Sequence, residues 1–410
     1  LITPPSRLEV YQGLSDNYAA IEPPVWSSLI AKYLIKKGYA AQILDAEAEN
    51  FTHEQTAKKI ISINPQLAIF MIYGQQPSAS TQCMPGGKKT CDKLNSLSSN
   101  SIKTIVVGTH ASALPKKTLE EEPYDFVCQG EGPITIAKLV DHIKNNKTKL
   151  ENIPGLWYWD KEAKVKSNKY SPMFEDLDRD VPGQAWELLD MSKYKAHNWH
   201  TFGKLESRKN YASLQTSLGC PFKCTFCCIN APFERNTIRF WSPRHIINQI
   251  KTLVEDYNIY NIKIPDEMFV LNPKQVTGIC DEIISRGYGK KLNFWAYARI
   301  DTLEDNEMLK KMIKSGFKWL ALGIESSSKH VRDGVVKGRF DNYDIEGIVK
   351  KVKDMGFYVG ANYIFGLPDD NNDSMKETLD LSIRINSEWA NFYSGMAYPG
   401  SQLYPMAKNK

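Results

Sequence analysis

The sequence contains no long apolar run. A bilayer-crossing helix needs about 18–20 consecutive apolar residues. No stretch of the 410 residues approaches that length, and the mean hydropathy of −0.41 agrees. The N-terminus also lacks the charged stretch and apolar core of a secretion signal. These absences predict a cytoplasmic protein that does not enter a membrane.

Charge of one sign is not concentrated anywhere either. Lys and Arg number 52 against 47 Asp and Glu, a formal net charge of +5. Nucleic-acid-binding domains gather far more basic charge on one face. The pairs Lys310-Lys311 and Lys350-Lys351 fall on predicted helices, where we interpret them as solvated faces. We therefore expect no nucleic-acid partner.

Cysteine is scarce, with 8 residues in the chain, too few for a disulfide scaffold. Four of them nevertheless lie close together, at Cys220, Cys224, Cys227 and Cys228. In a reducing compartment such a cluster indicates metal or redox chemistry. The remaining cysteines are scattered and are interpreted as structural.

Residues 1–150 alternate short β-rich runs with helix-length amphipathic runs. Alternation of this kind predicts a Rossmann-like α/β domain with parallel strands. A helix is expected over 25–37, and strands over 40–45, 66–73, 103–108 and 124–128. Ligands of such sheets bind outside the carboxyl ends of the strands, where loops rich in Gly, Ser and Pro follow.

Residues 151–205 are predicted to form a connector with a small hairpin at 156–159 and 163–167. Residues 206–410 alternate again on a longer period, which predicts a partial (β/α)6 barrel of the TIM type with chemistry at the strand C-termini. Its strands are expected at 213–218, 261–264, 292–297, 319–324, 358–363 and 389–393, and its helices at 244–257, 273–286, 304–315, 344–355 and 374–386.

Three cysteines of the cluster follow the first predicted barrel strand, as Cys220-x-x-x-Cys224-x-Phe226-Cys227. Three thiolates on one loop can hold one inorganic centre. Structural zinc prefers four ligands in two distant pairs, and no second pair with that spacing exists here. A [4Fe–4S] cluster bound by three thiolates keeps one iron open. Zinc and three unconnected buried thiols remain the alternatives.

The cysteine loop resembles the signature of the radical S-adenosylmethionine (SAM) superfamily, and "GCPFKCTFC" is similar to the branch with an N-terminal cobalamin-binding domain. Further motifs of that branch follow in order. They are Pro265-Asp266-Glu267-Met268-Phe269, Trp295-Ala296-Tyr297-Ala298-Arg299, Gly323-Ile324-Glu325-Ser326, Gly366-Leu367-Pro368 and Pro399-Gly400-Ser401. The connector at 176–194 is similar to the interdomain segment of the branch as well.

The resemblance implies that Cys220, Cys224 and Cys227 ligate a [4Fe–4S] cluster whose open iron binds SAM. It further implies that Phe226 lies beside adenine, that backbone near Asp266 and Glu267 accepts from the SAM ammonium, that Arg299 pairs with its carboxylate, and that Glu325 accepts ribose hydroxyls. The alternatives are an inter-strand ion pair for Arg299 and Glu325 and a helix N-cap for Asp266. Cys228 is interpreted as a packed thiol.

The resemblance also implies cobalamin in the first domain. Methyl-carrying domains often have Asp-x-His-x-x-Gly, but Asp45–Asn50 lacks both the histidine and the glycine. His110 is either a cobalt ligand or a loop histidine bonded to backbone, and the glycines at 130–132 also suit a plain turn and cap. The residues expected to contact cobalamin are Tyr73, Gly74, Gln75, Ser78, Ser80, Gly108, Thr109, His110, Ser112, Gly130, Glu131 and Gly132.

The resemblance implies a cobalamin-dependent radical SAM methyltransferase that methylates an unactivated carbon of a small molecule. The resemblance implies a 5′-deoxyadenosyl radical, methylcobalamin and an external one-electron reductant of the flavodoxin or ferredoxin type. One alternative keeps these cofactors but catalyses a radical rearrangement or cyclisation. Another is a non-catalytic zinc- or nucleotide-binding module.

Overall fold

The computed structural model describes residues 1–15, 18–74, 76, 78–145, 147–201, 204–337 and 344–409. Gln75, one of the residues expected at cobalamin, lies outside this range. The chain divides into two units. The first comprises Leu1–Tyr194, Cys227–Asn236 and Tyr398–Tyr404; the second comprises Lys195–Phe226, Thr237–Ala397 and Pro405–Lys410. In the described ranges no helix has the length and apolar character to span a membrane.

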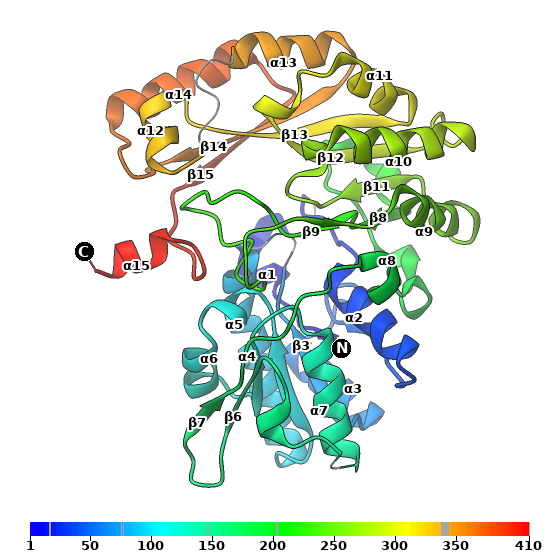
Figure 1. Cartoon of the computed structure of the whole chain (residues 1–410), viewed down its shortest axis with the longest axis vertical. Coiled ribbons are helices and arrows are strands. Elements are labelled where there is room, and N and C mark those ends of the chain that lie inside the picture. Colours follow the sequence, from blue (N-terminus) through cyan, green and yellow to red (C-terminus); the bar gives the residue numbers. More distant parts are fainter. Residues whose placement is uncertain are drawn as a thin grey trace. The chain divides into compact units, whose positions relative to one another are not determined.

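The first unit is built on one seven-stranded sheet in the order β2-β1-β3-β4-β5-β6-β7 (Figure 1). β1 to β5 are parallel, whereas β6 and β7 add an antiparallel hairpin. The 2-1-3-4-5 order is that of a doubly wound fold whose connections change direction between β1 and β3. The strands are β1 Ile2–Thr3, β2 Leu44–Asp45, β3 Leu67–Met71, β4 Lys103–Val107, β5 Phe126–Cys128, β6 Leu156–Trp159 and β7 Val165–Ser167.

Helices cover both faces of this sheet. β2 and β3 lie on opposite sides of β1, so right-handed crossovers put α2 and α3 on opposite faces. α2 packs with α7, and α3 packs with α4. The α3/α4 side encloses an apolar core that includes Phe70, Leu94 and Val106. The helices are α1 Arg7–Tyr11, α2 Val25–Lys36, α3 His53–Ile63, α4 Ala79–Ser98, α5 Thr109–Ala113, α6 Pro115–Glu121, α7 Pro133–Asn145 and α8 Leu177–Asp180.

The second unit contains a six-stranded, all-parallel sheet in the order β15-β14-β13-β12-β11-β8. β8 and β15 do not pair with each other, so the sheet is an open, partial barrel (Figure 1). A separate antiparallel pair, β9 with β10, adjoins the first strand in sequence. The strands are β8 Tyr211–Ser213, β9 Ser217–Leu218, β10 Arg239–Phe240, β11 Asn261–Ile264, β12 Asn293–Arg299, β13 Phe317–Glu325, β14 Tyr358–Phe365 and β15 Trp389–Ser394.

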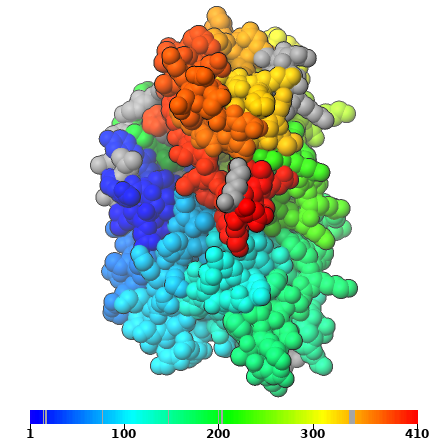
Figure 2. Space-filling model, turned by 90° about the vertical axis from the view of Figure 1, so that its left-hand side faces the viewer, coloured from blue at the N-terminus to red at the C-terminus, as the bar shows by residue number. Residues whose placement is uncertain are grey.

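Each barrel strand from β11 to β14 is preceded or followed by a helix that buries an apolar side. The outer face of the sheet carries stacked aromatic rings, such as Phe294 on Phe317 with centroids 4.7 Å apart. α13 and α14 form part of the outer surface of this unit, shown in orange in Figure 2. The helices are α9 Pro243–Glu255, α10 Pro273–Ser285, α11 Asn306–Lys314, α12 Lys329–Gly334, α13 Ile345–Asp354, α14 Asn372–Ile385 and α15 Leu403–Lys408.

The predicted fold class, a Rossmann-like domain followed by a partial (β/α)6 barrel, is confirmed. Two predicted strands are wrong in extent. The strand expected over 40–45 is confined to Leu44–Asp45. The strand expected over 213–218 is two strands, because Thr216 leaves the parallel ladder and its backbone N–H donates to the Asp266 carboxylate at 2.8 Å. The cysteine loop therefore follows β9, which lies outside the barrel sheet.

Candidate functional site

The cysteine loop begins where β9 ends. Gly219 adopts φ +88°, a conformation that favours glycine, and turns the chain into Cys220. Cys220 is buried, whereas Cys224 and Cys227 are half-buried, and all three thiols are outside any disulfide. The Thr225 N–H donates to the Val335 carbonyl at 3.0 Å, so the loop is tied to the segment after α12.

The loop offers three thiols as candidate ligands of a metal cluster. In the parts of the chain that the structure describes, no three His, Cys, Asp or Glu side chains are already grouped as a metal site. The donor set itself fits: the loop supplies three thiols that form no disulfide, and the buried Thr225 hydroxyl next to Cys224 has no hydrogen-bond partner. Burial, together with the nearby charges of Glu267 and Cys224, raises the pKa of Cys220 to about 11. A metal would have to displace that proton, as it does in other thiolate sites.

Phe226 lies at the edge of a small apolar cluster. It packs against Val331, Val335 and Leu367, and the Lys337 ammonium lies 6.0 Å from its ring centroid. One side of the ring is thus fixed by packing, which gives a flat surface beside the cysteines.

Asp266, just past β11, is fully inside the protein at 1% exposure. Its carboxylate accepts from Thr216 Oγ1 and Ser217 Oγ, each at 2.6 Å. Burial outweighs these bonds and raises its pKa to about 6. Asp266 therefore binds back to the strand that leads into the cysteine loop. It is not a helix N-cap, since Asn272 caps α10.

Glu267 is half-buried next to Asp266. Burial raises its pKa to about 7, while the charges of Lys263 and Lys337 act in the opposite direction. A carboxyl with this pKa changes its charge near neutral pH, so it can accept or release a proton there.

Arg299, at the end of β12, is engaged within the chain. Its Nε and Nη2 donate to the two carboxylate oxygens of Asp301, both at 2.9 Å, and Nη2 also donates to the Lys337 carbonyl at 3.1 Å. The guanidinium lies 4.0 Å from the ring centroid of Phe222 in the cysteine loop. The alternative of an inter-strand ion pair for Arg299 is wrong, because its partner Asp301 lies only two positions later in the chain.

Glu325, at the end of β13, forms an ion pair with Lys337, at 2.6 Å between Oε1 and Nζ. The backbone of Glu325 has φ +65°, uncommon for a residue with a side chain. Asp301 and Lys337 are not among the site residues that the sequence predicts. Asp301 has a signal in its spacing from Arg299, whereas Lys337 lies beyond a helix and has none.

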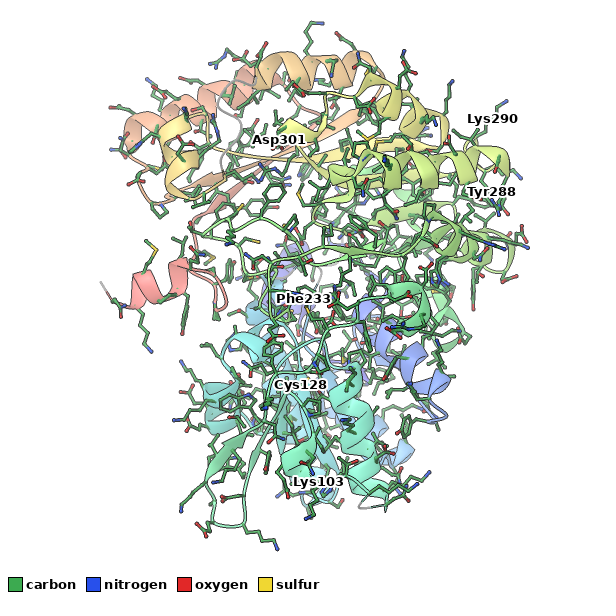
Figure 3. The ribbon with its side chains drawn as sticks, viewed as in Figure 1. Lys103, Cys128, Phe233, Tyr288, Lys290 and Asp301 are labelled. Carbon is green, nitrogen blue, oxygen red and sulfur yellow. The ribbon has the colours of Figure 1, made fainter. Side chains whose placement is uncertain are left out.

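The first unit places the predicted cobalamin residues at the carboxyl end of its parallel strands. In Figure 3, Lys103 at the start of β4 marks the amino end of the parallel strands, and Cys128 at the end of β5 marks their carboxyl end. Tyr73 follows β3 at the point where the connections change direction, and its ring stacks on Trp26 with centroids 4.6 Å apart. Its hydroxyl is buried and has no hydrogen-bond partner. An orphaned donor at this position fits a bound cofactor.

The loops after β3 and β4 are held together by Ser80. Its hydroxyl donates to the Ile72 carbonyl and accepts from the His110 N–H. Gly108 is required there, since a Cβ would lie 2.1 Å from the Ile72 carbonyl oxygen. Gly74 and Ser78 both precede α4, Ser78 directly as its N-cap residue, and Thr109 starts α5.

His110 lies in α5 rather than in a loop. Its Nδ1 is 3.1 Å from Thr81 Oγ1, so its partner is a hydroxyl. The alternative of a loop histidine bonded to backbone is therefore wrong. Burial and the charge of Lys117 lower its pKa to about 4. The ring is therefore neutral near pH 7.

The turn at 130–132 leads from β5 into α7. The Gly130 N–H donates to Ser112 Oγ at 3.1 Å. Gly132 has φ +103° and lies against Ile30 and Val107. The Glu131 carboxylate accepts from the Phe174 N–H at 3.2 Å.

Glu47 stands where methyl-carrying domains have their histidine. Its carboxylate accepts from the N–H groups of Ser6 and Arg7 at the start of α1. Asp45, two residues earlier, accepts from the Tyr194 hydroxyl at 3.1 Å. Both acids therefore serve the packing of the first unit.

Two family models match the chain. The model described as the Radical SAM superfamily covers residues 214–382, and that described as the B12 binding domain covers residues 11–140. The radical SAM match spans β9 to β14 in the second unit, and the B12-binding match spans β2 to β5 in the first.

Curated relatives match nearly the full chain. An uncharacterized methyltransferase of Pyrococcus horikoshii is 27% identical over 99% of this chain and 82% of its own. An anaerobic magnesium-protoporphyrin IX monomethyl ester cyclase of Rubrivivax gelatinosus is 26% identical over 93% of this chain, which spans 66% of that protein. A hopanoid C-3 methylase of Methylococcus capsulatus is 24% identical over 93% of this chain and 68% of its own.

Solved structures share the fold. The methyltransferase TsrM from Kitasatospora setae, with tryptophan and a SAM analogue bound, matches with a TM-score of 0.73 at 16% identity, over 99% of this chain and 75% of that one. The cobalamin-dependent SAM radical enzyme OxsB, with aqua-cobalamin and SAM bound, has a TM-score of 0.73 at 18% identity. The match covers 95% of this chain and 58% of that one.

Proposed function

The chain belongs to the radical SAM enzymes that carry a B12-binding domain, and we propose that it transfers a methyl group to an unactivated carbon of a small molecule. The observation that carries this proposal is the three-thiol loop, in a chain that matches both the radical SAM and the B12-binding models. Relatives named as methyltransferases or methylases support methyl transfer. The non-catalytic alternative is set aside, because the family is one of enzymes.

We assign cobalamin to residues 1–150, the connector to 151–205 and the radical SAM core to 206–410. Cys220, Cys224 and Cys227 would hold a [4Fe–4S] cluster. When bound, the cluster supplies the electron that cleaves SAM, and cobalamin carries the methyl group. An external reductant of the flavodoxin or ferredoxin type would deliver that electron, and we place the reaction in the cytoplasm.

The residues of the second unit would orient SAM against the loop. Phe226 offers its ring face to adenine, and Glu325 offers carboxylate oxygens to ribose. Asp266 keeps the cysteine loop in place through Thr216 and Ser217, so the backbone beside Glu267 can accept from the SAM ammonium. Arg299 is held by Asp301 and would bind the SAM carboxylate only by opening that fork.

The residues of the first unit would hold cobalamin at the carboxyl end of the sheet. Tyr73 supplies a buried hydroxyl, and Ser80 ties the loops after β3 and β4 together. His110 stays neutral and bonded to Thr81. Gly74, Gln75, Ser78, Gly108, Thr109, Ser112, Gly130, Glu131 and Gly132 complete the proposed contacts.

The test is anaerobic reconstitution of the full chain with iron, sulfide and cobalamin, read by visible absorption. The wild type should take up both cofactors. Cys224→Ala should lose the iron–sulfur absorption and keep corrin uptake, whereas the buried Cys280→Ala on α10 should keep both. A full cluster in Cys224→Ala would refute the ligand assignment, and absence of corrin after loading would refute the cobalamin assignment.

Cyclisation is the second candidate, supported by relatives named as magnesium-protoporphyrin IX monomethyl ester cyclases. The two reactions leave different products from SAM. Methyl transfer converts SAM to S-adenosylhomocysteine, and the substrate gains a methyl group. A cyclase adds no methyl group. Release of S-adenosylhomocysteine by the loaded, reduced enzyme therefore favours methyl transfer, and 5′-deoxyadenosine alone favours cyclisation.

A further inference from the structure

The chain segment that begins with Cys227 belongs to the first unit. Cys227–Asn236 groups by its contacts with Leu1–Tyr194, whereas Lys195–Phe226, which includes the other two cysteines of the motif, groups with the second unit. Cys227–Asn236 is here called the post-cysteine segment. Whatever holds this segment also restrains the Cys227 thiol, because the two are joined by the backbone.

An aromatic stack connects the post-cysteine segment to the end of β3. The buried ring of Phe233 lies 6.3 Å from the ring of Trp26, centroid to centroid. Trp26 in turn stacks on Tyr73 at 4.6 Å, with an angle of 10° between the ring planes. Figure 3 shows Phe233 beyond Cys128, past the carboxyl end of the parallel strands. The segment thus reaches Tyr73, a residue expected at cobalamin, through a single indole ring.

A hydrogen bond connects the post-cysteine segment to the turn after β5. The Tyr170 hydroxyl donates to the Ala231 carbonyl at 3.1 Å. The Tyr170 ring also lies beside Gly130, where an added Cβ would meet a ring carbon at 3.5 Å. Gly130 is another residue expected at cobalamin. Tyr170 therefore lies between the segment and a second part of the expected cobalamin site.

Gly400 connects the post-cysteine segment to α5. It adopts φ +89°, and an added Cβ would lie 2.6 Å from the Ala231 Cβ and 3.2 Å from the Ala113 Cβ. Only glycine combines this backbone conformation with so close an approach. Ala113 is the last residue of α5, the helix after β4 that carries His110. The missing side chain of Gly400 thus lets the segment pack close to a third part of the expected cobalamin site.

The three contacts lead to three different connections, those after β3, β4 and β5. We place cobalamin at all three of them, so the cofactor and the post-cysteine segment share one wall. Binding at a loop costs the ordering of that loop, and a loop that another ligand has already ordered no longer carries this cost. Two ligands that depend on one wall therefore strengthen each other, and by linkage they do so by the same factor.

We propose, on the basis of the proposed function, that the post-cysteine segment couples the binding of the two cofactors. The segment is held in place when cobalamin is bound at the first unit, which favours uptake of the cluster by Cys227. The cluster favours cobalamin binding by the same factor. Phe233 and Gly400 are the positioning residues of this coupling, because Phe233 acts through Trp26 and Gly400 acts through Ala231.

The experiment measures the affinity of the full chain for hydroxocobalamin by anaerobic equilibrium dialysis. One sample is reconstituted with iron and sulfide, and the other is kept free of the cluster, with its thiols reduced. The Kd of the wild type for hydroxocobalamin should be roughly ten-fold lower in the cluster-loaded sample, within the usual range of coupling between two sites. The ratio of the two Kd values is the readout, because a uniform loss of cobalamin affinity leaves it unchanged.

Two substitutions should lower this ratio towards one. Phe233→Ala removes the ring that lies against Trp26. Gly400→Ala places a Cβ against that of Ala231, and adding Ala231→Gly removes the contacted Cβ and should restore much of the ratio. Gly38→Ala is the matched control, because Gly38 has nearly the same φ, +87°, and a Cβ there would meet no heavy atom within 4 Å. It should keep the wild-type ratio.

The failures are distinguishable. Equal Kd values in the two wild-type samples would overturn the coupling although both cofactors bind, and this comparison needs no variant. A wild-type ratio that both Phe233→Ala and Gly400→Ala retain would overturn the role of the post-cysteine segment. A ratio lowered as strongly by Gly38→Ala would assign the effect to backbone strain and overturn that role too. A wild type that takes up no corrin or no cluster refutes the proposed function instead.

Discussion

The ammonium of Lys337 and the carboxylate of Glu325 form an ion pair at 2.6 Å, with side chains that are 9% and 8% exposed. Burial alone would lower the pKa of Lys337, but the charges of Glu325 and Cys224 outweigh burial and raise it. The backbone of Glu325, one partner of this pair, is left-handed, with φ +65°. It therefore joins the end of β13 to the surroundings of the cysteine loop.

Removal of one partner should be strongly destabilising. Lys337→Met leaves a buried carboxylate without its cation, and we expect the free energy of unfolding to fall by about 3–5 kcal/mol. Urea denaturation of the apoprotein measures this. Lys350→Met is the matched control, because Lys350 pairs with Asp354 on the surface with side chains 75% and 63% exposed, and it should change stability by less than about 1 kcal/mol. Similar losses in both variants would contradict a buried pair.

Asp266 should make stability fall as pH rises. In an unfolded chain its carboxyl loses a proton near pH 4, whereas burial raises the folded-state pKa to about 6. The folded state thus holds the proton more tightly, and this contribution is complete below about pH 4 and is lost as pH rises through about 6. Relative to Asp266→Asn, the wild type should lose about 2–3 kcal/mol over that window. Urea denaturation at several pH values tests this, and parallel curves for the two proteins would rule it out.

His110 should make stability fall as pH falls, the opposite of the effect of Asp266. Burial and the charge of Lys117 lower its pKa to about 4, below the ordinary value of about 6.5. The unfolded chain binds the proton more readily, so stability is complete above about pH 6.5 and is lost as pH falls through about 4. His110→Gln should flatten the pH dependence of the unfolding free energy in this range by up to about 3 kcal/mol. The same substitution at the exposed His330 should not, and an unchanged slope in His110→Gln would count against a buried, neutral imidazole.

Periodicity predicted the elements whose burial is regular. β11 was predicted over 261–264 and is found at Asn261–Ile264, and the other barrel strands from β12 to β15 lie within a few residues of their predicted bounds. Strands of a parallel sheet are covered on both faces, so their apolar runs are continuous and easy to recognise. The first barrel strand was predicted wrongly, because Thr216 exchanges its ladder bond for the carboxylate of Asp266, which is distant in sequence.

The candidate site was predictable where residues follow a strand end in a motif, and not where partners meet only in the folded chain. Arg299 is identifiable from its motif, and Asp301 is suggested by its place two residues later, but the sequence does not show that both carboxylate oxygens accept from the guanidinium. Lys337 lies 12 residues after Glu325, beyond α12, so no local pattern joins them. Tertiary contacts of this kind decide which charges are available for a ligand.

The adjacent cysteines 227 and 228 provide the sharpest test of which thiols hold the cluster. Cys228 is 4% exposed, whereas Cys227 is half-buried. If three thiolates hold the cluster, Cys227→Ala should lose most of the iron–sulfur absorption after anaerobic reconstitution. Cys228→Ala should keep the absorption and the iron content, and should cost only the packing of a small buried side chain, about 1 kcal/mol in unfolding free energy. The two neighbouring thiols differ in little except burial and their place in the motif, so the comparison isolates the ligand. Loss of the cluster in Cys228→Ala with retention in Cys227→Ala would assign the third ligand to Cys228 instead.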